Sequence, residues 1–403
     1  MRIIYLHQYF NTPEMVGGTR SYEIGRRLVA AGHDVHMVTS WRTPDKRSGW
    51  FESIEGGMRV HWLPVEYSNL MDFKARIKAF IRFATYSAGR AAALKGDVVY
   101  ATSTPLTIAI PGAYASWRTN TPMIFELRDL WPDVPIAMGV LKNTGVRWAS
   151  RRLEGFAYSR AKHIIALTPT MRDFVSGKGV PLEKISVISN AADLERFASV
   201  RAVTCTDESK PERFNRDRVL VYCGGLGPAH GPTFLVHLAV EFLRIGAPIV
   251  LLVAGDGSLR LELERFAEKT GCLNKTIRFL GSIPQQEVPR LYADADASIM
   301  TMQDCELLYR HSVQNKFFDS LAAGKPVFAN YVGWASQLAE QHEAGVILRN
   351  DDTRSAAQLI VEKVKDDAWL ERAGGHARAL AESQFSWDDL AARVERVLLG
   401  ATD

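Results

Sequence analysis

The stretch "RIIYLHQYFNTPEMVGGTRSYEIGRRLVAAGHDVHMVTS" (residues 2–40) decides the fold. It opens with the apolar, β-branched run 2–7 and passes through a glycine pair into a segment with apolar residues at helical spacing. It closes with a second apolar run, 33–40. Runs this apolar are typical of parallel strands, which are buried on both faces. A strand, a helix and a second strand in this order predict a βαβ unit.

The same alternation of short apolar runs and longer helical segments continues along the whole chain. The predicted strands are 2–7, 33–40, 97–103, 123–129, 163–169 and 185–190 in the first half, and 218–225, 248–255, 276–282, 297–302, 325–330 and 345–348 in the second. The pattern predicts an α/β protein with two doubly wound, Rossmann-like domains.

A chain of 403 residues is too long for one ordinary core, which agrees with two domains. The polar, unperiodic segment 201–218 is the predicted linker between an N-terminal domain (1–200) and a C-terminal domain (219–385). The amphipathic segment 386–403 predicts a final helix that packs back on the first domain. Ligands of doubly wound sheets bind at the carboxyl ends of the strands, so we expect the two domains to face each other across a cleft that holds the active site.

Composition narrows the class of protein. Hydrophobic residues make up 47% and charged residues 23%, values typical of a globular protein. Four cysteines without a CxxC pair argue against a zinc site or a disulfide framework and suit a reducing cytoplasm. The first apolar run is too short for a signal peptide, and no stretch approaches 18 consecutive apolar residues, so we expect no membrane span.

Charge is distributed unevenly between the halves. Residues 1–200 hold 26 Lys and Arg against 17 Asp and Glu, whereas residues 201–403 hold 23 against 28. A basic first half and an acidic second half predict domains with different partners.

Two glycine-rich loops are candidate phosphate sites. Gly17 and Gly18 lie between a predicted strand and helix, where backbone N–H groups can approach a phosphate, although a plain turn also fits. A second set, Gly224, Gly225, Gly227 and Gly231, follows the first strand of the second domain. Because no acidic residue is evident about 20 residues on, a nicotinamide cofactor is poorly supported.

Two motifs with acidic residues lie next to predicted buried strands, one at the end of a strand and one before the start of another. Arg128 and Asp129 end a predicted strand, where they either face a ligand or form a salt-bridged loop. Asp294 and Asp296 form an Asp-x-Asp pattern that suits a divalent metal with nucleotide phosphates. Their position between a helix and a buried strand favours a surface corner instead.

The stretch "HSVQNKFFDSLAAGKPVFA" (311–329) carries charges in an apolar setting. Asp319 lies about one turn inside a largely buried helix, where an unpaired carboxylate is costly. A carboxylate accepts two hydroxyl donors at once, which suits a ribose diol, although a solvated helix face is the alternative. Lys316 can balance a diphosphate, and Asn315 can open the helix.

Four motifs in order resemble those of retaining GT-B glycosyltransferases of glycosyltransferase family 4. They are "VISNAADLERF" (187–197), "VAGDGSLRLELE" (253–264), "IRFLGSIPQQEVPRLYADADASIM" (277–300) and "FDSLAAGKPVFA" (318–329). The resemblance extends over nearly the whole chain. Two further motifs, "ELRDLWPD" (126–133) and "NKFFD" (315–319), resemble bacterial O-antigen and capsule transferases of the N-acetylfucosaminyl type.

This resemblance implies transfer of a sugar, an N-acetylated or deoxy hexosamine, from a UDP-sugar to a polyprenyl-diphosphate-linked acceptor, with retention at the anomeric carbon. The UDP-sugar is a substrate, and the resemblance implies neither a cofactor nor a metal. The expected catalytic residues are Arg128, Asp129 and Lys316. The expected substrate-binding residues are Gly17, Gly18, Gly225, Gly281, Ser282, Ile283, Arg310, His311, Asn315 and Asp319.

Roles follow from the same resemblance. Gly17 and Gly18, Lys316, and Arg310 or Arg128 would stabilise the charge on the leaving diphosphate. Asp319 would bind the ribose, the backbone of 281–283 would meet the uracil, and Asp129 would orient the acceptor or the sugar.

The chain departs from the family pattern at several positions, and Asp319 stands where the family has a Glu. His311 stands where a Glu is usual, Gly225 and His230 stand where an Arg and a Lys are usual, and Arg128 replaces a His. The usual pair of phosphate-neutralising cations is therefore missing from its loop. Lys316, Arg310 and Arg128 are the candidates to replace it, and His311 is where we expect the sugar preference to be set.

The first half should carry the acceptor side. Segments 69–97 and 147–163 combine apolar residues at helical spacing with Lys and Arg, which suits an anionic membrane surface, although solvated domain helices give the same pattern. We expect a peripheral location at the cytoplasmic face of the inner membrane. The rival functions are a nucleotide-sugar 2-epimerase of GT-B fold and a catalytically silent nucleotide-sugar-binding subunit. No nucleic-acid module is recognisable.

Overall fold

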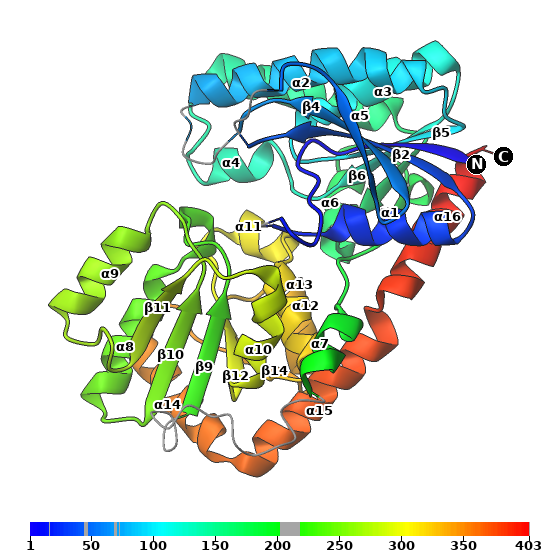
Figure 1. Ribbon diagram of the computed structural model, residues 1–403. Coiled ribbons are helices and arrows are strands. Elements are labelled where there is room, and N and C mark those ends of the chain that lie inside the picture. The colour runs from blue at the N-terminus through cyan, green and yellow to red at the C-terminus, as the bar shows by residue number, and fades with distance from the viewer. Residues whose placement is uncertain (16, 44–46, 68–70, 72, 202–217, 403) are drawn as a thin grey trace. The chain divides into compact units, whose positions relative to one another are not determined.

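The computed structural model describes residues 1–402 except 16, 44–46, 68–70, 72 and 202–217. The chain forms two compact units, Met1–Ser189 with Trp387–Asp403, and Asn190–Ser386. Each unit holds one sheet with helices on both faces, so the predicted pair of Rossmann-like α/β domains is confirmed (Figure 1).

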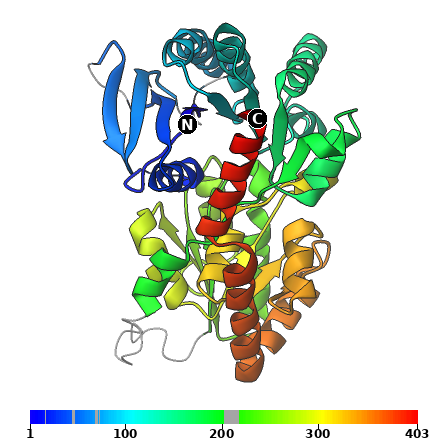
Figure 2. The same ribbon diagram turned by 90° about the vertical axis from the view of Figure 1, so that its right-hand side faces the viewer.

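Unit 1 contains an eight-stranded sheet in the order β3-β4-β2-β1-β5-β6-β7-β8. Its strands are β1 (Arg2–Leu6), β2 (Asp34–Trp41), β3 (Phe51–Glu55), β4 (Met58–Pro64), β5 (Val98–Thr102), β6 (Met123–Leu127), β7 (His163–Ala166) and β8 (Ile185–Val187). The strands pair in parallel, except that β3 and β4 form an antiparallel hairpin at one edge (blue in Figure 2). The hairpin was not predicted, because β3 alternates between half-buried and exposed residues and lacks a continuous apolar run.

The helices of unit 1 cover both faces of this sheet. They are α1 (Arg20–Ala30), α2 (Phe73–Ala93), α3 (Ala109–Thr119), α4 (Asp133–Ala137), α5 (Thr144–Arg160), α6 (Pro169–Ser176) and α16 (Trp387–Thr402), with short 3-10 turns at Leu106–Ile108 and Leu182–Lys184. Helices α2 and α3 pack together on one face, and α1 packs against α16 on the other. Arg27 pairs with Asp388 at 2.6 Å, which ties the C-terminal helix to the first unit.

Unit 2 contains a six-stranded parallel sheet in the order β11-β10-β9-β12-β13-β14. Its strands are β9 (Arg218–Cys223), β10 (Ile249–Ala254), β11 (Ile277–Gly281), β12 (Ala297–Met300), β13 (Val327–Ala329) and β14 (Gly345–Ile347). Its helices are α7 (Leu194–Arg201), α8 (Thr233–Arg244), α9 (Arg260–Lys269), α10 (Val288–Ala293), α11 (Glu306–His311), α12 (Asn315–Ala322), α13 (Trp334–Gln341), α14 (Thr353–Lys365) and α15 (Asp367–Gln384), with 3-10 turns at Pro228–His230 and Gln285–Glu287.

The division between the units falls after Ser189, earlier than the predicted boundary at residue 200. The reason is that α7 packs against α10 of unit 2, where the Phe197 and Tyr292 rings lie 5.8 Å apart. Of the predicted linker 201–218, residues 202–217 lie outside the described part of the chain, Arg201 ends α7 and Arg218 begins β9.

The strand order places the ligand-binding edges. In unit 1 the order reverses between β1 and β5, and in unit 2 it reverses between β9 and β12. The loops that follow such strands diverge to opposite faces and leave a crevice at the carboxyl edge, where doubly wound sheets bind ligands. None of the helices that the structure describes is long and apolar enough to cross a membrane.

Candidate functional site

Lys316 lies in the first turn of α12 and reaches the glycine-rich loop after β9. Its side chain is buried, and its Nζ lies 3.6 Å from the centroid of the Tyr222 ring. A Cβ atom on Gly224 would lie 2.9 Å from this Nζ, so a larger residue at this position would displace the ammonium from the loop. Burial lowers the pKa of Lys316 to about 7, and within the described residues its Nζ has no hydrogen-bond partner. A buried ammonium without a partner is costly, and an anion would stabilise it.

His230 and Gln314 lie beside Lys316. The Nδ1 of His230 is 3.2 Å from Nε2 of Gln314, which also donates to the carbonyl of Thr301. Burial and the neighbouring Lys316 lower the pKa of His230 to about 4, so this ring is neutral at pH 7. His230 therefore brings no positive charge to the position where the resemblance implies a Lys, and Lys316 is the basic side chain beside it.

Asp319 forms an ion pair that the sequence did not suggest. Its Oδ1 accepts a hydrogen bond from Nη2 of Arg196 at 2.7 Å. Burial raises the pKa of Asp319 to about 6, since it outweighs the opposing effect of Arg196. The only sequence signal for Arg196 was its place in the "DLERF" motif. A carboxylate has about four lone-pair sites, so this pair leaves capacity for ribose hydroxyls.

The other predicted residues of this edge have different surroundings. Asn315 accepts a hydrogen bond from Asn190 at 2.9 Å. His311 is buried at the end of α11, whereas Arg310 is exposed and pairs with Glu306 at 3.2 Å. Asn315, Lys316 and Asp319 thus all lie on α12. The charge of Arg310 is partly compensated by Glu306 on α11.

The loops after β9, β10 and β11 are joined backbone to backbone. The N–H of Gly224 donates to Ala254, and that of Gly255 donates to Gly281 at 2.7 Å. Gly281 has a φ of +75°, and after it Ser282 is exposed and Ile283 half-buried. Gly225 accepts a hydrogen bond from the Tyr222 hydroxyl at 2.8 Å. The predicted phosphate and uracil segments therefore lie along one edge of the sheet.

The Asp-x-Asp motif lies at the opposite edge, near the amino end of β9. Asp296 accepts hydrogen bonds from the N–H of Val219 at 2.7 Å and from Arg218 at 3.2 Å, so it braces the start of that strand. This is the structural corner that the sequence favoured. No cluster of three metal-ligating side chains occurs among the residues described.

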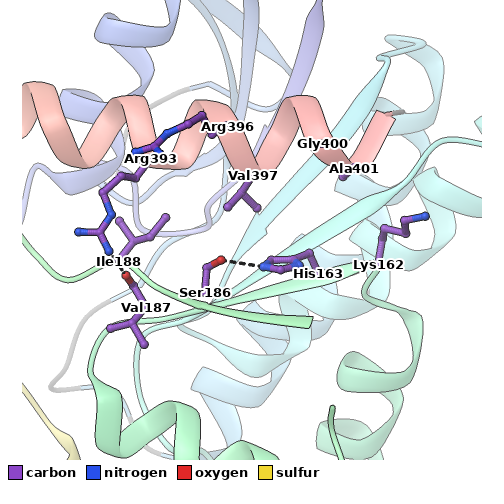
Figure 3. A pocket seen from close by; sticks show the side chains of 10 residues that line it. All are labelled: Lys162, His163, Ser186, Val187, Ile188, Arg393, Arg396, Val397, Gly400 and Ala401. Carbon is purple, nitrogen blue, oxygen red and sulfur yellow. Dashed lines mark hydrogen bonds between the residues drawn. The ribbon is translucent and has the colours of Figure 1, made fainter. Parts of the chain in front are cut away.

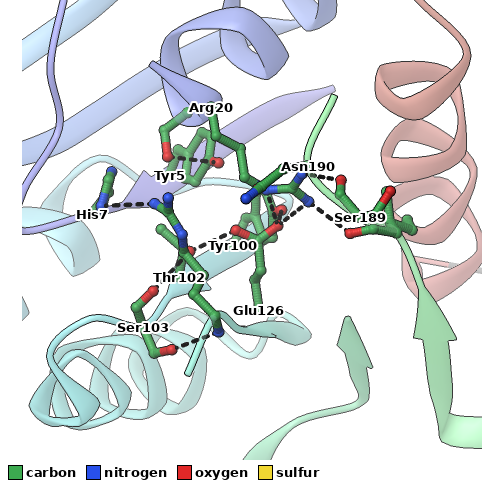
Figure 4. A network of polar contacts seen from close by, with 12 residues as sticks. Tyr5, His7, Arg20, Tyr100, Thr102, Ser103, Glu126, Ser189 and Asn190 are labelled. Carbon is green, nitrogen blue, oxygen red and sulfur yellow. Dashed lines mark hydrogen bonds and ion pairs between the residues drawn. The ribbon is translucent and has the colours of Figure 1, made fainter. Parts of the chain in front are cut away.

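Glu126 is the centre of a buried network at the carboxyl edge of unit 1 (Figure 4). It accepts hydrogen bonds from Arg20 at 2.8 Å, Tyr100 at 2.5 Å and Thr102 at 2.7 Å. Burial opposes the ionisation of Glu126, but Arg20 outweighs it and lowers the pKa to about 2. Arg20 also donates to the carbonyl of Ile188 at 3.1 Å. The network therefore holds the segment after β8 against the sheet.

Arg128 and Asp129 follow the same strand, β6. The Nη1 of Arg128 lies 3.4 Å from Nε2 of His7, and its backbone N–H donates to Ser103. Asp129 is exposed and accepts a hydrogen bond from Thr104 at 3.0 Å. Burial and Arg128 lower the pKa of His7 well below its ordinary value. Arg128 and Asp129 thus lie at the carboxyl edge of the unit 1 sheet, as expected from their position after a strand.

Sequence reasoning missed two further residues at this edge. His7 and Gln8 are buried directly after β1, and His7 Nδ1 and both side-chain polar atoms of Gln8 lack a partner within the described part of the chain. Buried polar atoms are nearly always paired, so these atoms are candidates to bind a ligand. Two polar residues directly after an apolar strand were the available signal. Gly17, with a φ of +132°, and Gly18, whose carbonyl accepts from Asn11, precede α1 nearby in the sequence.

Comparison with known proteins gives two consecutive domain matches. Residues 17–191 match the glycosyl transferase 4-like domain, and residues 217–366 match glycosyl transferases group 1. D-inositol 3-phosphate glycosyltransferase of Corynebacterium efficiens is 24% identical over 302 residues, 68% of each chain. GDP-mannose-dependent alpha-(1-6)-phosphatidylinositol monomannoside mannosyltransferase of Mycobacterium tuberculosis is 24% identical over 281 residues, 67% of this chain and 66% of that one.

Solved structures show the same fold over the whole length. HepE of Anabaena, solved in complex with UDP, superposes with a TM-score of 0.71 at 16% identity and covers 99% of this chain and 100% of its own. The two matched domains together span most of the sequence, in the order expected for the GT-B fold. The chain therefore carries a glycosyl transferase 4-like domain followed by a glycosyl transferases group 1 domain, and it is a hexosyltransferase enzyme with the GT-B fold.

Proposed function

We propose that this protein transfers a sugar, an N-acetylated or deoxy hexosamine, from a UDP-sugar to an acceptor hydroxyl with retention at the anomeric carbon. The observation that carries the proposal is the buried ammonium of Lys316, which lies against the glycine-rich loop without a hydrogen-bond partner among the described residues. HepE, a structural neighbour, was solved in complex with UDP, which supports the choice of nucleotide.

Lys316 would stabilise the charge that develops on the leaving diphosphate. An ammonium in a water-poor site interacts with a phosphate more strongly than one in bulk solvent, and it needs no reorganisation during the reaction. An anion beside Lys316 would also raise its pKa and restore the charge that burial disfavours. No protein nucleophile is required if the leaving phosphate itself accepts the proton of the acceptor hydroxyl, as the family resemblance implies.

The remaining roles are assigned on the same basis. Asp319 would bind the ribose, and the backbone of 281–283 would meet the uracil. Arg128 and Asp129 would act on the acceptor or the transferred sugar. Because the Lys316 ammonium would neutralise charge on the diphosphate, we propose that transfer needs neither a divalent metal nor another cofactor. Loss of transfer in excess EDTA, with rescue by Mg²⁺ or Mn²⁺, would contradict this part of the proposal.

We propose a polyprenyl-diphosphate-linked acceptor in bacterial surface polysaccharide assembly, as in O-antigen or capsule, reached at the cytoplasmic face of the inner membrane. Exposed apolar side chains on two neighbouring helices support it. Ile81 and Tyr86 on α2 are 59% and 58% exposed, and Trp117 on α3 is 71% exposed. Amphipathic aromatic residues favour the interface between lipid and water. On α2, Lys74, Lys78 and Arg82 are exposed as well, which suits anionic headgroups.

The donor is tested first. Thermal unfolding with UDP, several UDP-sugars and GDP-mannose identifies the ligand, because a ligand that binds only the folded state raises the melting temperature. GDP-mannose is included because one relative is named as GDP-mannose-dependent. Incubating the stabilising UDP-sugar with a polyprenyl-diphosphate acceptor should then give an elongated acceptor with the donor's anomeric configuration by NMR. A new epimer formed without acceptor would replace the proposal with a 2-epimerase, and binding without turnover would favour a silent subunit.

The membrane surface is tested separately. The variant Ile81→Ser/Trp117→Ser should co-float less with phosphatidylglycerol liposomes than the wild type. The matched control is Leu261→Ser on α9 of unit 2, where Leu261 is 66% exposed. Equal flotation of wild type with anionic and zwitterionic liposomes would remove the membrane part of the proposal and leave the donor chemistry untouched.

A further inference from the structure

A cavity of about 440 Å³ lies in unit 1 between α16 and the sheet edge formed by β7 and β8 (Figure 3). His163, which lines it, is the first residue of β7 and pairs in register with Ile124 near the amino end of β6. Arg128 follows the carboxyl end of the same strand β6. The cavity is therefore separate from the residues expected to act in sugar transfer.

The lining of this cavity is cationic. Lys162, Arg393 and Arg396 contribute to it, and no Asp or Glu does. Arg393 lies 3.9 Å from the carboxylate of Asp389, and Lys162 and Arg396 form no ion pair with any residue that the structure describes. Three like charges around one cavity repel each other, and a bound anion would relieve that repulsion.

Hydrogen bonds hold several of these groups in place. Arg393 donates to the carbonyl of Val187 on the edge strand β8 at 2.5 Å. His163 Nε2 lies 2.9 Å from the Ser186 hydroxyl, as Figure 3 shows. Burial lowers the pKa of His163, so its ring is a neutral hydrogen-bonding group beside the three cations. Arginine together with neutral donors is typical of sites that bind phosphate groups.

We propose that this cavity binds a phosphate-bearing anion, either a phosphate monoester or a diphosphate. Its volume falls within the range of small-molecule sites, roughly 300–1,000 Å³, so the ligand can be larger than inorganic phosphate. The phosphate can belong to a soluble metabolite or to a phospholipid headgroup, and the two sources are separated by experiment.

The test compares two double variants that each remove two positive charges. Lys162→Gln/Arg396→Gln alters exposed side chains of the cavity, and Arg265→Gln/Lys269→Gln alters exposed side chains of α9 in unit 2. Isothermal titration with inorganic pyrophosphate is done in saturating UDP, so that any pyrophosphate site at Lys316 is already occupied. We expect the cavity variant to bind pyrophosphate roughly tenfold or more weakly than wild type, because two charge-assisted contacts are lost, and the control to bind normally. If UDP does not bind, comparing the pyrophosphate affinities of the two double variants still shows whether the cavity contributes to binding.

Co-sedimentation with phosphatidylglycerol vesicles forms the second arm. Loss of vesicle binding in the cavity variant alone, without a change for pyrophosphate, assigns the phosphate to a lipid headgroup and supports the proposal. If wild type binds neither pyrophosphate nor the vesicles, the proposal is overturned. Equal weakening in both double variants also overturns it, because binding would then follow net charge.

Discussion

The Nζ of Lys316 lies 3.6 Å from the centroid of the Tyr222 ring, so a residue at the start of α12 reaches the strand that precedes the glycine-rich loop. The two residues come from different βαβ units of the same sheet. Their contact holds a basic side chain beside the glycine-rich loop, in which Gly225 and His230 stand where the resemblance implies an Arg and a Lys. A desolvated cation–π contact contributes about 2 kcal/mol or more, which partly offsets the cost of burying the ammonium.

Replacing Lys316 by Met should remove most of the stabilisation of the leaving group. We expect kcat to fall by about 10²–10³-fold, the range for loss of one electrostatic contact to the transition state. The melting temperature should not fall, because the variant removes a buried charge that lacks a partner among the described residues. Lys269→Gln, an exposed change on α9, is the control. Wild-type kcat in Lys316→Met would refute the assignment.

UDP should bind more weakly as the pH rises above about 7. The pKa of Lys316 in the free protein is lowered to about 7 by burial, so the ammonium that attracts the diphosphate is progressively lost above that pH. Titration calorimetry at pH 6.5, 7.5 and 8.5 measures this trend. In Lys316→Met the same series should be flat, and a parallel decline in both proteins would assign the effect to another group.

Lys316 also affects the pH dependence of stability. Its pKa is about 7 in the folded state against an ordinary value of 10.5, so between these values the unfolded chain binds a proton that the folded chain lacks. The contribution of this residue to the free energy of unfolding therefore rises with pH from about 7 to about 10. Urea unfolding of wild type and Lys316→Met at pH 7 and pH 9 gives the difference. The free energy of unfolding of wild type minus that of Lys316→Met should be more positive at pH 9 than at pH 7, and a less positive value at pH 9 would contradict the lowered pKa.

The ribose assignment of Asp319 can be tested with 2′-deoxy-UDP. We expect wild type to prefer UDP by roughly 10- to 150-fold, since a hydrogen bond to a charged group is worth roughly 1.5–3 kcal/mol. Asp319→Ala should bind the two nucleotides equally. Arg196→Met removes the 2.7 Å ion pair but keeps the carboxylate, so its preference for UDP should persist. An unchanged preference in Asp319→Ala would show that the carboxylate serves only the ion pair.

Glu126→Gln should destabilise the protein by about 3–5 kcal/mol in urea unfolding, because it leaves the Arg20 guanidinium buried without its counter-charge. Glu183→Gln, at an exposed position, is the control. Because the pKa of Glu126 is lowered to about 2 from an ordinary value of 4.5, this contribution is present above pH 4.5 and is lost as the pH falls towards 2. A loss already complete at pH 5 would contradict the ionised carboxylate.

Much of the fold was predictable because its signals are local. Each of the twelve predicted strands corresponds to an observed strand, since the strands of a parallel sheet covered on both faces form nearly continuous apolar runs. The β3–β4 hairpin escaped prediction, because the edge strand β3 alternates between half-buried and exposed residues and the apolar residues of β4 are interrupted by Arg59 and His61.

For the site, the sequence determined which residue types follow the strands at the carboxyl edges: the glycine loops, Arg128 with Asp129, and the polar start of α12. Those positions follow from local pattern and from the resemblance of the motifs.

The tertiary structure alone decided their electrostatics. Asp319 meets Arg196 across 123 positions of sequence, and Lys316 meets Tyr222 through the packing of two βαβ units. The cavity lined by Lys162 and Arg396 likewise lies between strands of unit 1 and the last helix of the chain. Burial and charge partners depend on which distant segments pack together, and no local pattern of residues encodes them.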